Sequence, residues 1–280
     1  MKRLLLICGA AAAMMMVASA ASMTVVAQAP GASAWTGPKT VDGQPDVQGV
    51  WDADLSGTYS LTHPISGGAA FNLAVGGKID TKNPSRIVDP ADGLVPYQPW
   101  AAALQKRQQL DAEYPTRPEH IDTQNRCIIG GVPRPFYNTQ IMFVQPRGYV
   151  IAMSDQYQSA RMIALDGRPH IGKDLKLYMG DSVGRWEGNT LVTDVTSLNG
   201  RPRLSMVGDF ISNNAHITER IQFHSRDKMT YSATITDPRV FTRPWTLRVE
   251  MTRRESYEFW EQGCHEGERS AAHMLIEAAR

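Results

Sequence analysis

Residues 180–196 read GDSVGRWEGNTLVTDVT and contain two β-prone runs separated by a short turn. The turn is Glu187-Gly188-Asn189, and the run Thr190–Thr196 that follows it is rich in β-branched residues. A Gly-x-Ser-x-Gly pattern opens the stretch at Gly180–Gly184. In hydrolases this pattern forms a sharp turn between a strand and a helix, which exposes the serine hydroxyl. Because a strand follows here in place of a helix, the stretch predicts a β-hairpin, and its glycines are assigned to turns.

Short β-prone runs continue on both sides of this hairpin, with turn residues such as Pro146-Arg147-Gly148 and Asp166-Gly167 between them. Many strands at this spacing without intervening helices predict an antiparallel sandwich or barrel. Gly49-Val50-Trp51 resembles the Gly-x-Trp that opens the first strand of lipocalin-like barrels, and it favours the barrel. Besides Thr190–Thr196, the predicted strands are Ile141–Val144, Tyr149–Met153, Arg161–Leu165, His216–Phe223, Thr230–Thr236 and Pro244–Met251.

Two helices are predicted to flank the strands. The first is Pro99–Glu113, because proline suits the first helical position, good helix formers follow it and Pro115 ends the pattern. The second begins at about Arg269, since small and apolar residues recur at helical spacing from Ala271 to Ala278. The predicted fold class is therefore mainly β: an antiparallel lipocalin-like (calycin-like) barrel with one mid-chain helix and a C-terminal helix.

The first residues have the pattern of a signal peptide. Lys2 and Arg3 precede an uncharged run over 4–26, and small residues allow cleavage after Ala20 or Ala27. An uncleaved membrane anchor is the alternative, since about 20 apolar residues span a bilayer, but the Ala-rich second half favours cleavage. We expect a periplasmic or secreted protein in which 1–27 is the signal peptide, 28–46 a flexible lead-in and 47–280 a single barrel domain.

The charge balance argues against nucleic acid and membrane surfaces as partners. The chain has 29 Lys+Arg and 28 Asp+Glu, so removal of Lys2 and Arg3 leaves a net charge near −1. No later stretch is apolar enough to span a bilayer, so we expect no stable membrane insertion after signal cleavage.

Cysteine usage fits an oxidising compartment. Only Cys127 and Cys264 remain after signal cleavage, and two cysteines in an exported chain usually pair. The resulting disulfide would contribute roughly 3–5 kcal/mol to stability, because it closes a long loop. The alternative is a cysteine nucleophile with His265 beside it, which is disfavoured because an exported thiol tends to oxidise.

A carboxylate lies on the apolar face of the predicted strand His216–Phe223. Three apolar residues share that face with Glu219, while His216 and the other polar residues point the opposite way. Burial raises the pKa of a carboxyl group toward values that are useful for proton transfer. Glu219 is therefore the first candidate for a general acid or base. The alternative is a structural Glu219 held by an arginine, for which Arg161 is the candidate.

Other side chains complete the predicted acid/base pocket. Asp194 lies mid-strand among apolar residues, and Asp155 and Tyr157 end another strand. Such groups suit cofactor-free proton transfer, and they equally suit the orientation of a polar group on a bound ligand. The expected catalytic residues are Glu219, Asp194 and Asp155, with Tyr157 and Arg161 as orienting groups, and the expected substrate-binding residues are Trp186, Trp245, Asp181, Arg185 and His265.

Neither a metal nor a nucleotide cofactor is expected. His63, His120 and His170 are isolated in predicted loops. His216 and Glu219 face opposite sides of a strand, so they cannot share a metal ion. No glycine-rich phosphate loop stands between a strand and a helix.

Several motifs together resemble those of a group of exported bacterial β-rich proteins. The motifs cover about residues 120–280 and read NRCIIGGVPR, IALDGRPH, GDSVGRWEGNTLVTDVT, HITERIQF, DPRVFTRPWTLRVEM and GCHEGERSAAHM. This chain has Asn189 where the group usually has Asp after Trp-Glu-Gly. The resemblance implies an exported β-rich domain with a Cys127–Cys264 bridge, and it brings no activity or site residue with it.

These observations lead to an expected function. The chain would take a small hydrophobic or aromatic metabolite into the barrel and carry out cofactor-independent elimination, isomerisation or hydrolysis. A non-catalytic binding protein for the same kind of ligand, and an envelope protein without a ligand, are the alternatives. A catalyst requires two or more titratable groups at one cavity, a carrier requires only one, and a structural protein would have a filled interior with Glu219 paired.

Overall fold

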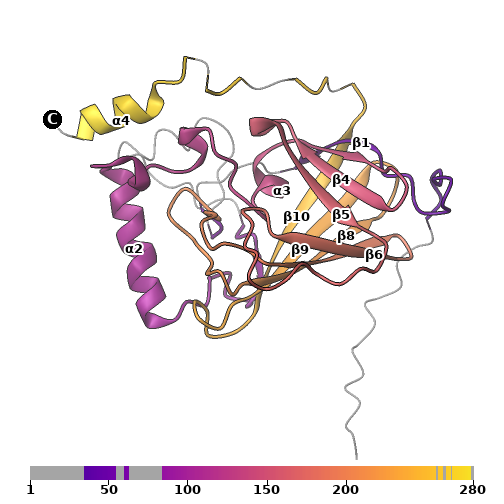
Figure 1. Cartoon of the computed structure of the whole chain (residues 1–280), viewed down its shortest axis with the longest axis horizontal. Coiled ribbons are helices and arrows are strands. Elements are labelled where there is room, and N and C mark those ends of the chain that lie inside the picture. The colour runs from indigo at the N-terminus through magenta and orange to yellow at the C-terminus, as the bar shows by residue number, and fades with distance from the viewer. Residues whose placement is uncertain are drawn as a thin grey trace, which may run out of the picture. The chain divides into compact units, whose positions relative to one another are not determined.

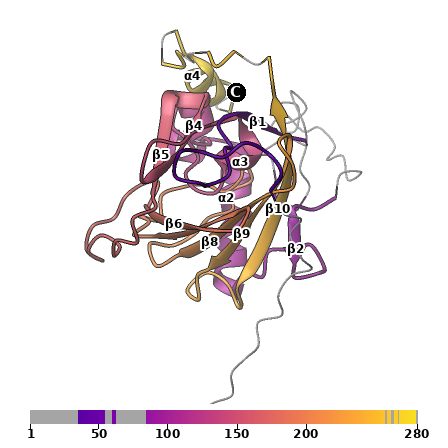
Figure 2. The same ribbon diagram turned by 90° about the vertical axis from the view of Figure 1, so that its right-hand side faces the viewer.

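Nine strands form a closed ring in the computed structural model, which describes residues 35–54, 60–62, 84–256, 258–260, 263–265 and 267–278. The predicted mainly β barrel is confirmed (Figures 1 and 2). Strand β1 pairs with both β3 and β10, which closes the ring, and the short β2 adds to the outer edge of β10. The strands are β1 Gly49–Ala53, β2 Ile87–Asp89, β3 Ile141–Val144, β4 Tyr149–Ser154, β5 Ser159–Ala164, β6 Asp181–Glu187, β7 Thr190–Thr196, β8 His216–Phe223, β9 Lys228–Thr236 and β10 Trp245–Arg254.

One pair of neighbours departs from the predicted antiparallel pattern. Strands β5 and β6 run parallel, with Ile163 opposite Ser182 and Ala164 opposite Val183. A closed ring with an odd number of strands cannot alternate in direction at every step, so at least one parallel pair is required. Parallel neighbours need a long crossover connection in place of a tight hairpin. Here residues 165–180 make that connection.

Aromatic side chains fill the interior of the barrel. Trp51 and Phe223 meet edge to face with 5.5 Å between ring centroids, and Phe136 stacks on Tyr231 at 4.0 Å. All four side chains are at most 2% exposed. Arg253 lies over the Trp51 ring, 4.8 Å from its centroid, in a cation–π contact. Trp51 of the Gly-x-Trp motif is thus part of the packed core.

Helix α2, Pro99–Glu113, has the predicted bounds, with a proline in its first turn. Only Ala101 of this helix is buried, and polar side-chain contacts attach the helix to neighbouring loops. The Trp100 indole donates to the Arg239 carbonyl at 3.2 Å, and the Gln105 amide donates to the Val207 carbonyl at 2.8 Å. The remaining helices are α3 Pro135–Asn138, α4 Ser270–Ala278 and the 3₁₀ turns η1 Pro118–His120, η2 Gln124–Arg126 and η3 Gln156–Gln158.

The described part of the predicted lead-in, from Trp35 to Asp46, forms a turn against the barrel. Lys39 and Pro45 form an antiparallel bridge, and Trp35 packs on Phe223 with 6.4 Å between ring centroids. The turn is therefore anchored to the core by an aromatic contact that composition could not reveal. The predicted signal peptide, 1–27, lies outside the described residues. Within the described ranges, no helix is both long and apolar enough to cross a bilayer.

The expected disulfide between Cys127 and Cys264 is present, with 5.6 Å between the Cα atoms. Cys127 follows η2, and Cys264 precedes α4. Helix α4 begins close to the predicted Arg269, and its Met274 sulfur accepts a 3.8 Å hydrogen bond from the Asn125 amide. The bridge thus fastens the C-terminal segment to the loop that precedes the barrel strands β3 and β4.

We predict that replacement of both cysteines, Cys127→Ser with Cys264→Ser, lowers the free energy of unfolding by about 3–5 kcal/mol, because the bridge closes a loop of 137 residues in the unfolded chain. Urea unfolding followed by tryptophan fluorescence measures the loss. A reductant should destabilise the parent protein by the same amount and leave the variant unchanged. Equal stability of the oxidised parent and the variant would contradict the prediction.

Candidate functional site

Glu219 is completely buried inside the barrel and is paired with Arg161. The Arg161 guanidinium donates through Nη1 to Glu219 Oε1 at 2.9 Å and through Nη2 to Oε2. The Tyr231 hydroxyl donates to the same carboxylate at 2.5 Å, and Arg161 Nε donates to Ser182 Oγ at 2.9 Å. The carboxylate is thus neutralised and hydrogen-bonded, as expected for a glutamate held by an arginine.

The space beside this pair is very small. A cavity of about 10 Å³ lies against Arg161, between Phe136, Ala152 and Met179. A water molecule needs roughly 10–15 Å³ of such space. Trp245, an expected ligand-binding residue, is fully buried and packs on Phe241 with 5.4 Å between ring centroids. At the level of Arg161, the described interior therefore has room for at most one water molecule.

We predict that Glu219→Gln lowers the free energy of unfolding by about 3–5 kcal/mol, because it leaves the buried Arg161 charge without its counter-ion. The double variant Arg161→Met with Glu219→Leu should recover most of this loss, since it removes both charges. Chemical denaturation compares the two with Glu250→Gln, a control at an exposed strand position. A stable single variant would show that Glu219 is not needed as a counter-ion.

Outside the barrel, four titratable side chains form a continuous hydrogen-bonded chain across β6, β7 and β8. Asp181 begins β6, Asp194 lies on β7 and His216 begins β8. His170 comes from the 165–180 connection and joins the two aspartates, with Nδ1 2.7 Å from Asp181 Oδ2 and Nε2 2.8 Å from Asp194 Oδ2. His216 Nε2 contacts the other oxygen of Asp194. We call these four residues the wall array.

The inner end of the wall array is held rigidly. Asp181 accepts hydrogen bonds from both terminal nitrogens of Arg168, at 2.6 and 3.2 Å, and from the Ile171 amide at 3.1 Å. Burial acts to raise the pKa of Asp181, but the hydrogen bonds from Arg168, His170 and Ile171 outweigh it and lower the pKa to about 2. Asp181 therefore remains a carboxylate at all ordinary pH values and fixes the orientation of His170.

Exposure increases along the wall array from Asp181 to His216. The Asp181 side chain is 7% exposed, His170 26%, Asp194 37% and His216 44%. Both nitrogens of His170 face carboxylate oxygens. A doubly protonated imidazole donates a hydrogen bond to each of two such oxygens, whereas a neutral imidazole donates to one of them. The array thus runs from a buried, fixed carboxylate to an imidazole that solvent and small molecules can reach.

Of the residues selected from sequence, the structure brings Asp181 and Asp194 together in the wall array and Glu219 and Arg161 together inside the barrel. Asp155 instead accepts a 2.5 Å hydrogen bond from the Thr139 hydroxyl, and the Tyr157 hydroxyl donates to the Gln124 carbonyl at 2.8 Å. Trp186 packs on Phe223, with 6.0 Å between ring centroids, and Arg185 pairs with Glu187 on the surface. His265 is exposed in the turn after Cys264.

Sequence reasoning missed His170 and His216 as members of a site. Alternation correctly predicts that His216 lies on the outer face of its strand, but it does not show which side chains from other segments meet it there. His170 was set aside as an isolated loop histidine. The signal that could have found them is the shared outward position of Asp181, Asp194 and His216 near the ends of neighbouring strands.

A metal site requires ligand atoms that converge. Among the described residues, the one group of three potential ligand atoms within 4.8 Å of each other is Cys127, Cys264 and Glu268. Both sulfurs of that group are joined in the disulfide, so neither is a free thiolate. In the wall array, His170 directs its two nitrogens at different carboxylates and therefore bridges them.

Fold and site together define a class: a nine-stranded β-barrel with a histidine and aspartate array on its outer wall. Comparison of the chain with models of known protein families finds no match, and comparison with curated proteins finds none either. The function of the chain must therefore be inferred from the geometry of its side chains.

We predict that Asp181→Asn lowers the free energy of unfolding at pH 7 by about 1–2 kcal/mol. The folded-state pKa of about 2 lies below the usual aspartate value, so this stabilisation is present at neutral pH and is lost as the pH falls from about 4 to 2. Urea unfolding between pH 2.5 and 7 should show a shallower acid dependence for Asp181→Asn. Asp174→Asn, an exposed position in the same connection, is the matched control and should behave as the parent does.

Proposed function

We propose that this protein is a cofactor-independent acid/base enzyme in which His216 is the catalytic base on the outer wall of the barrel. The observation that carries the proposal is the continuous chain of contacts from Arg168 through Asp181, His170 and Asp194 to His216. Paired groups with fixed partners and graded exposure are what proton transfer requires. The reaction classes are elimination, isomerisation and hydrolysis, each of which begins with removal of a proton.

The geometry at His216 supports the proposed role of a base. Its Nε2 faces Asp194, so a neutral imidazole carries its proton there and presents an unprotonated Nδ1. No hydrogen bond to this Nδ1 is formed by any residue that the structure describes. Nδ1 would take a proton from a C–H group next to a carbonyl or from a water molecule. Asp194 would stabilise the resulting imidazolium, and His170 would hold Asp194 in place.

A small hydrophobic or aromatic molecule with one polar group is the proposed substrate. The 165–180 connection presents Leu175 and Leu177, which are 59% and 46% exposed. The Leu177 amide donates to the Ser197 carbonyl at 2.8 Å, which places this residue beside the end of β7. Lys176 reaches the Asn213 carbonyl at 2.9 Å and ties the connection to the loop before His216. Exposed apolar side chains and the wall array therefore share one side of the barrel.

Export from the cytoplasm is part of the proposal. Lys2 and Arg3 followed by an uncharged run are typical of a signal peptide, and small residues provide cleavage positions. The Cys127–Cys264 disulfide supports this placement, because such bonds persist in oxidising compartments. The enzyme would then act in the periplasm or outside the cell. Its substrate would be a metabolite that reaches that compartment.

The experiment is a screen for turnover with two kinds of probe. Hydrolysis of 4-nitrophenyl acetate and 4-nitrophenyl benzoate is followed by absorbance, and exchange of α-protons in small aryl ketones in D₂O is followed by NMR. We predict that His216→Asn lowers the rate of the active reaction by about 10²–10⁴-fold, because the proton acceptor is lost. Asp194→Asn should lower it too, since Asn cannot stabilise an imidazolium.

His224→Asn is the matched control, because His224 is an exposed histidine beyond the far end of the same strand, and its one side-chain hydrogen bond among the described residues is to Thr230. Its rates should equal those of the parent. Binding of a probe without turnover would favour the carrier alternative. Turnover that is unchanged in His216→Asn would refute the proposed base, and absence of both turnover and binding would refute the proposal as a whole.

A further inference from the structure

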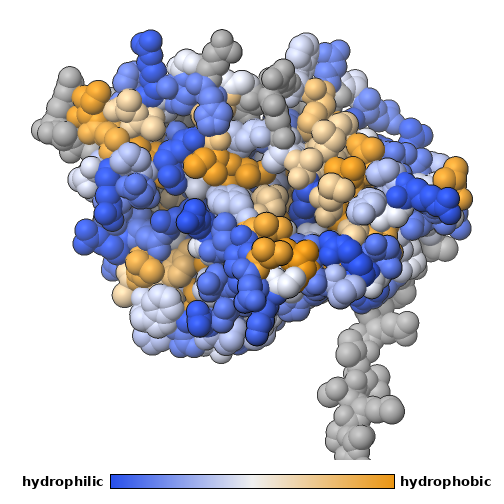
Figure 3. All heavy atoms as spheres, viewed as in Figure 1, coloured by the Kyte–Doolittle hydropathy of each residue, from blue (hydrophilic) through white to orange (hydrophobic). Residues whose placement is uncertain are grey.

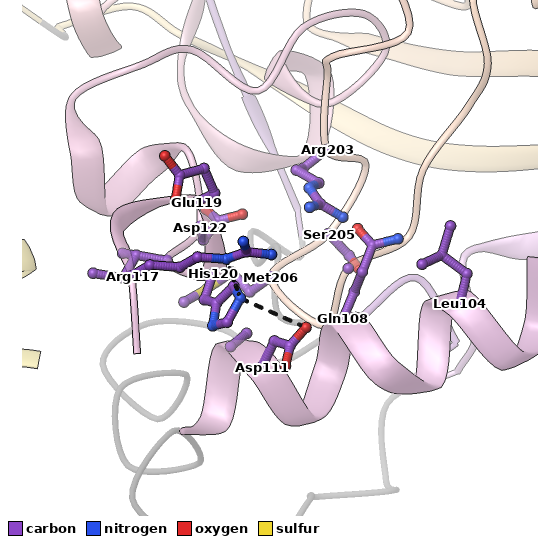
Figure 4. A pocket seen from close by; sticks show the side chains of 13 residues that line it. Leu104, Gln108, Asp111, Arg117, Glu119, His120, Asp122, Arg203, Ser205 and Met206 are labelled. Atoms are coloured by element: carbon purple, nitrogen blue, oxygen red, sulfur yellow. Dashed lines mark hydrogen bonds and ion pairs between the residues drawn. The ribbon is translucent and has the colours of Figure 1, made fainter. Parts of the chain in front are cut away.

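A second site lies away from the wall array, between α2, η1 and the loop 203–208. It is a cleft of about 350 Å³, close to the size of pockets that bind small molecules (Figure 4). Apolar side chains of Leu104, Ile121 and Met206 line it together with polar groups. None of the residues selected from sequence lines this cleft, so it is independent of the proposed catalytic function.

Arg203 is the charged group that sets the chemistry of the cleft. Its side chain is half-buried, and burial lowers the pKa of its guanidinium, against the opposing influence of Asp122. Within the described parts of the chain, the Arg203 guanidinium makes no hydrogen bond or ion pair with another residue. A half-buried cation without a hydrogen-bonded counter-ion is costly, and an anionic ligand would remove that cost.

The acidic group that acts on Arg203, Asp122, is already paired with another arginine. Asp122 is buried, and both of its oxygens accept hydrogen bonds from Arg134, at 2.9 and 2.8 Å. Arg134 is itself completely buried and also donates to the Arg203 carbonyl at 3.2 Å. Asp122, which itself lines the cleft, therefore forms a closed ion pair with Arg134. This pair leaves the Arg203 guanidinium directed into the cleft (Figure 4).

The opposite wall limits the charge of the ligand. The Arg117 guanidinium donates to His120 Nε2 at 2.7 Å, and Asp111 lies 3.8 Å from the same nitrogen (Figure 4). Asp111 and Glu119 give this wall two carboxylates. They would repel a ligand with several negative charges, whereas one anionic group at Arg203 avoids them. A planar carboxylate also matches the planar fork of a guanidinium.

We propose that the cleft binds a small monocarboxylate whose apolar or aromatic body lies against Leu104, Ile121 and Met206 while its carboxylate pairs with Arg203. A small molecule is a better match for this surface than a protein partner with a broad apolar interface. On the face shown in Figure 3, hydrophobic residues form small groups separated by hydrophilic ones. The Ser205 hydroxyl is already committed to Asp209, at 2.6 Å, so Gln108 is the neutral side chain left to contact the carboxylate.

Isothermal titration of the processed protein with benzoate, phenylacetate and 3-phenylpropionate tests this site. We predict binding of at least one acid, and a loss of affinity of about 10–100-fold in Arg203→Gln, because a charge-assisted bidentate contact is removed. Arg201→Gln is the matched control, since Arg201 is exposed two positions away. Benzamide, which is neutral, and inorganic phosphate should bind at least tenfold more weakly than the best acid.

A second variant protects the test against a folding defect. Leu104→Glu places a negative charge in the cleft from a helical position that is 40% exposed, so it should abolish binding without unfolding the protein. Binding should persist in His216→Asn, which separates this site from the wall array. Equal affinity for benzamide, unchanged affinity in Arg203→Gln, or no binding of any of the three acids would overturn the proposal.

Discussion

A closed ring with an odd number of strands must contain a parallel pair, and in this barrel that constraint determines where the wall array lies. The parallel pair is β5 and β6, so the chain cannot turn back directly and must cross over through residues 165–180. That crossover places Arg168 and His170 against the outer side of β6 and β7. A tight hairpin at this point would leave Asp181 and Asp194 without the imidazole that joins them.

The same pair of strands also organises the interior. Arg161 on β5 donates one hydrogen bond to Ser182 on β6 and another to Glu219 on β8. Tyr231 on β9 completes the cluster. Strand β6 therefore carries a polar network on each face: Ser182 points inward and Asp181 points outward. A buried ion pair of this kind contributes little net stability, but the loss of one partner is costly. A shifted strand register would separate the two charges, so the pair disfavours other registers.

Local features of the fold could be predicted from the sequence because they depend on near neighbours. Period-two alternation placed Glu219 inside and His216 outside, and helix signals placed α2 at Pro99–Glu113. Alternation does not state which face of an isolated strand is inside. Asp194 shares its face of the strand with apolar Val192, a pattern typical of an inward face, yet Val192 is buried on the outer face, opposite exposed Arg220. Residue patterns within one strand contain no information about a distant loop that covers it.

Both candidate sites arise because residues far apart in the chain compete for the same counter-ions. Sequence patterns could not reveal this competition. Arg134 occupies both oxygens of Asp122, and among the described residues the Arg203 guanidinium is left without a hydrogen-bonded counter-ion. On the barrel wall, Arg168 neutralises Asp181, Asp181 holds one nitrogen of His170, and the other nitrogen of His170 orients Asp194. In each case one arginine neutralises a buried carboxylate completely. The remaining group, His216 on the wall and Arg203 in the cleft, is left open toward solvent, and there we propose that a substrate or ligand completes the hydrogen bonding.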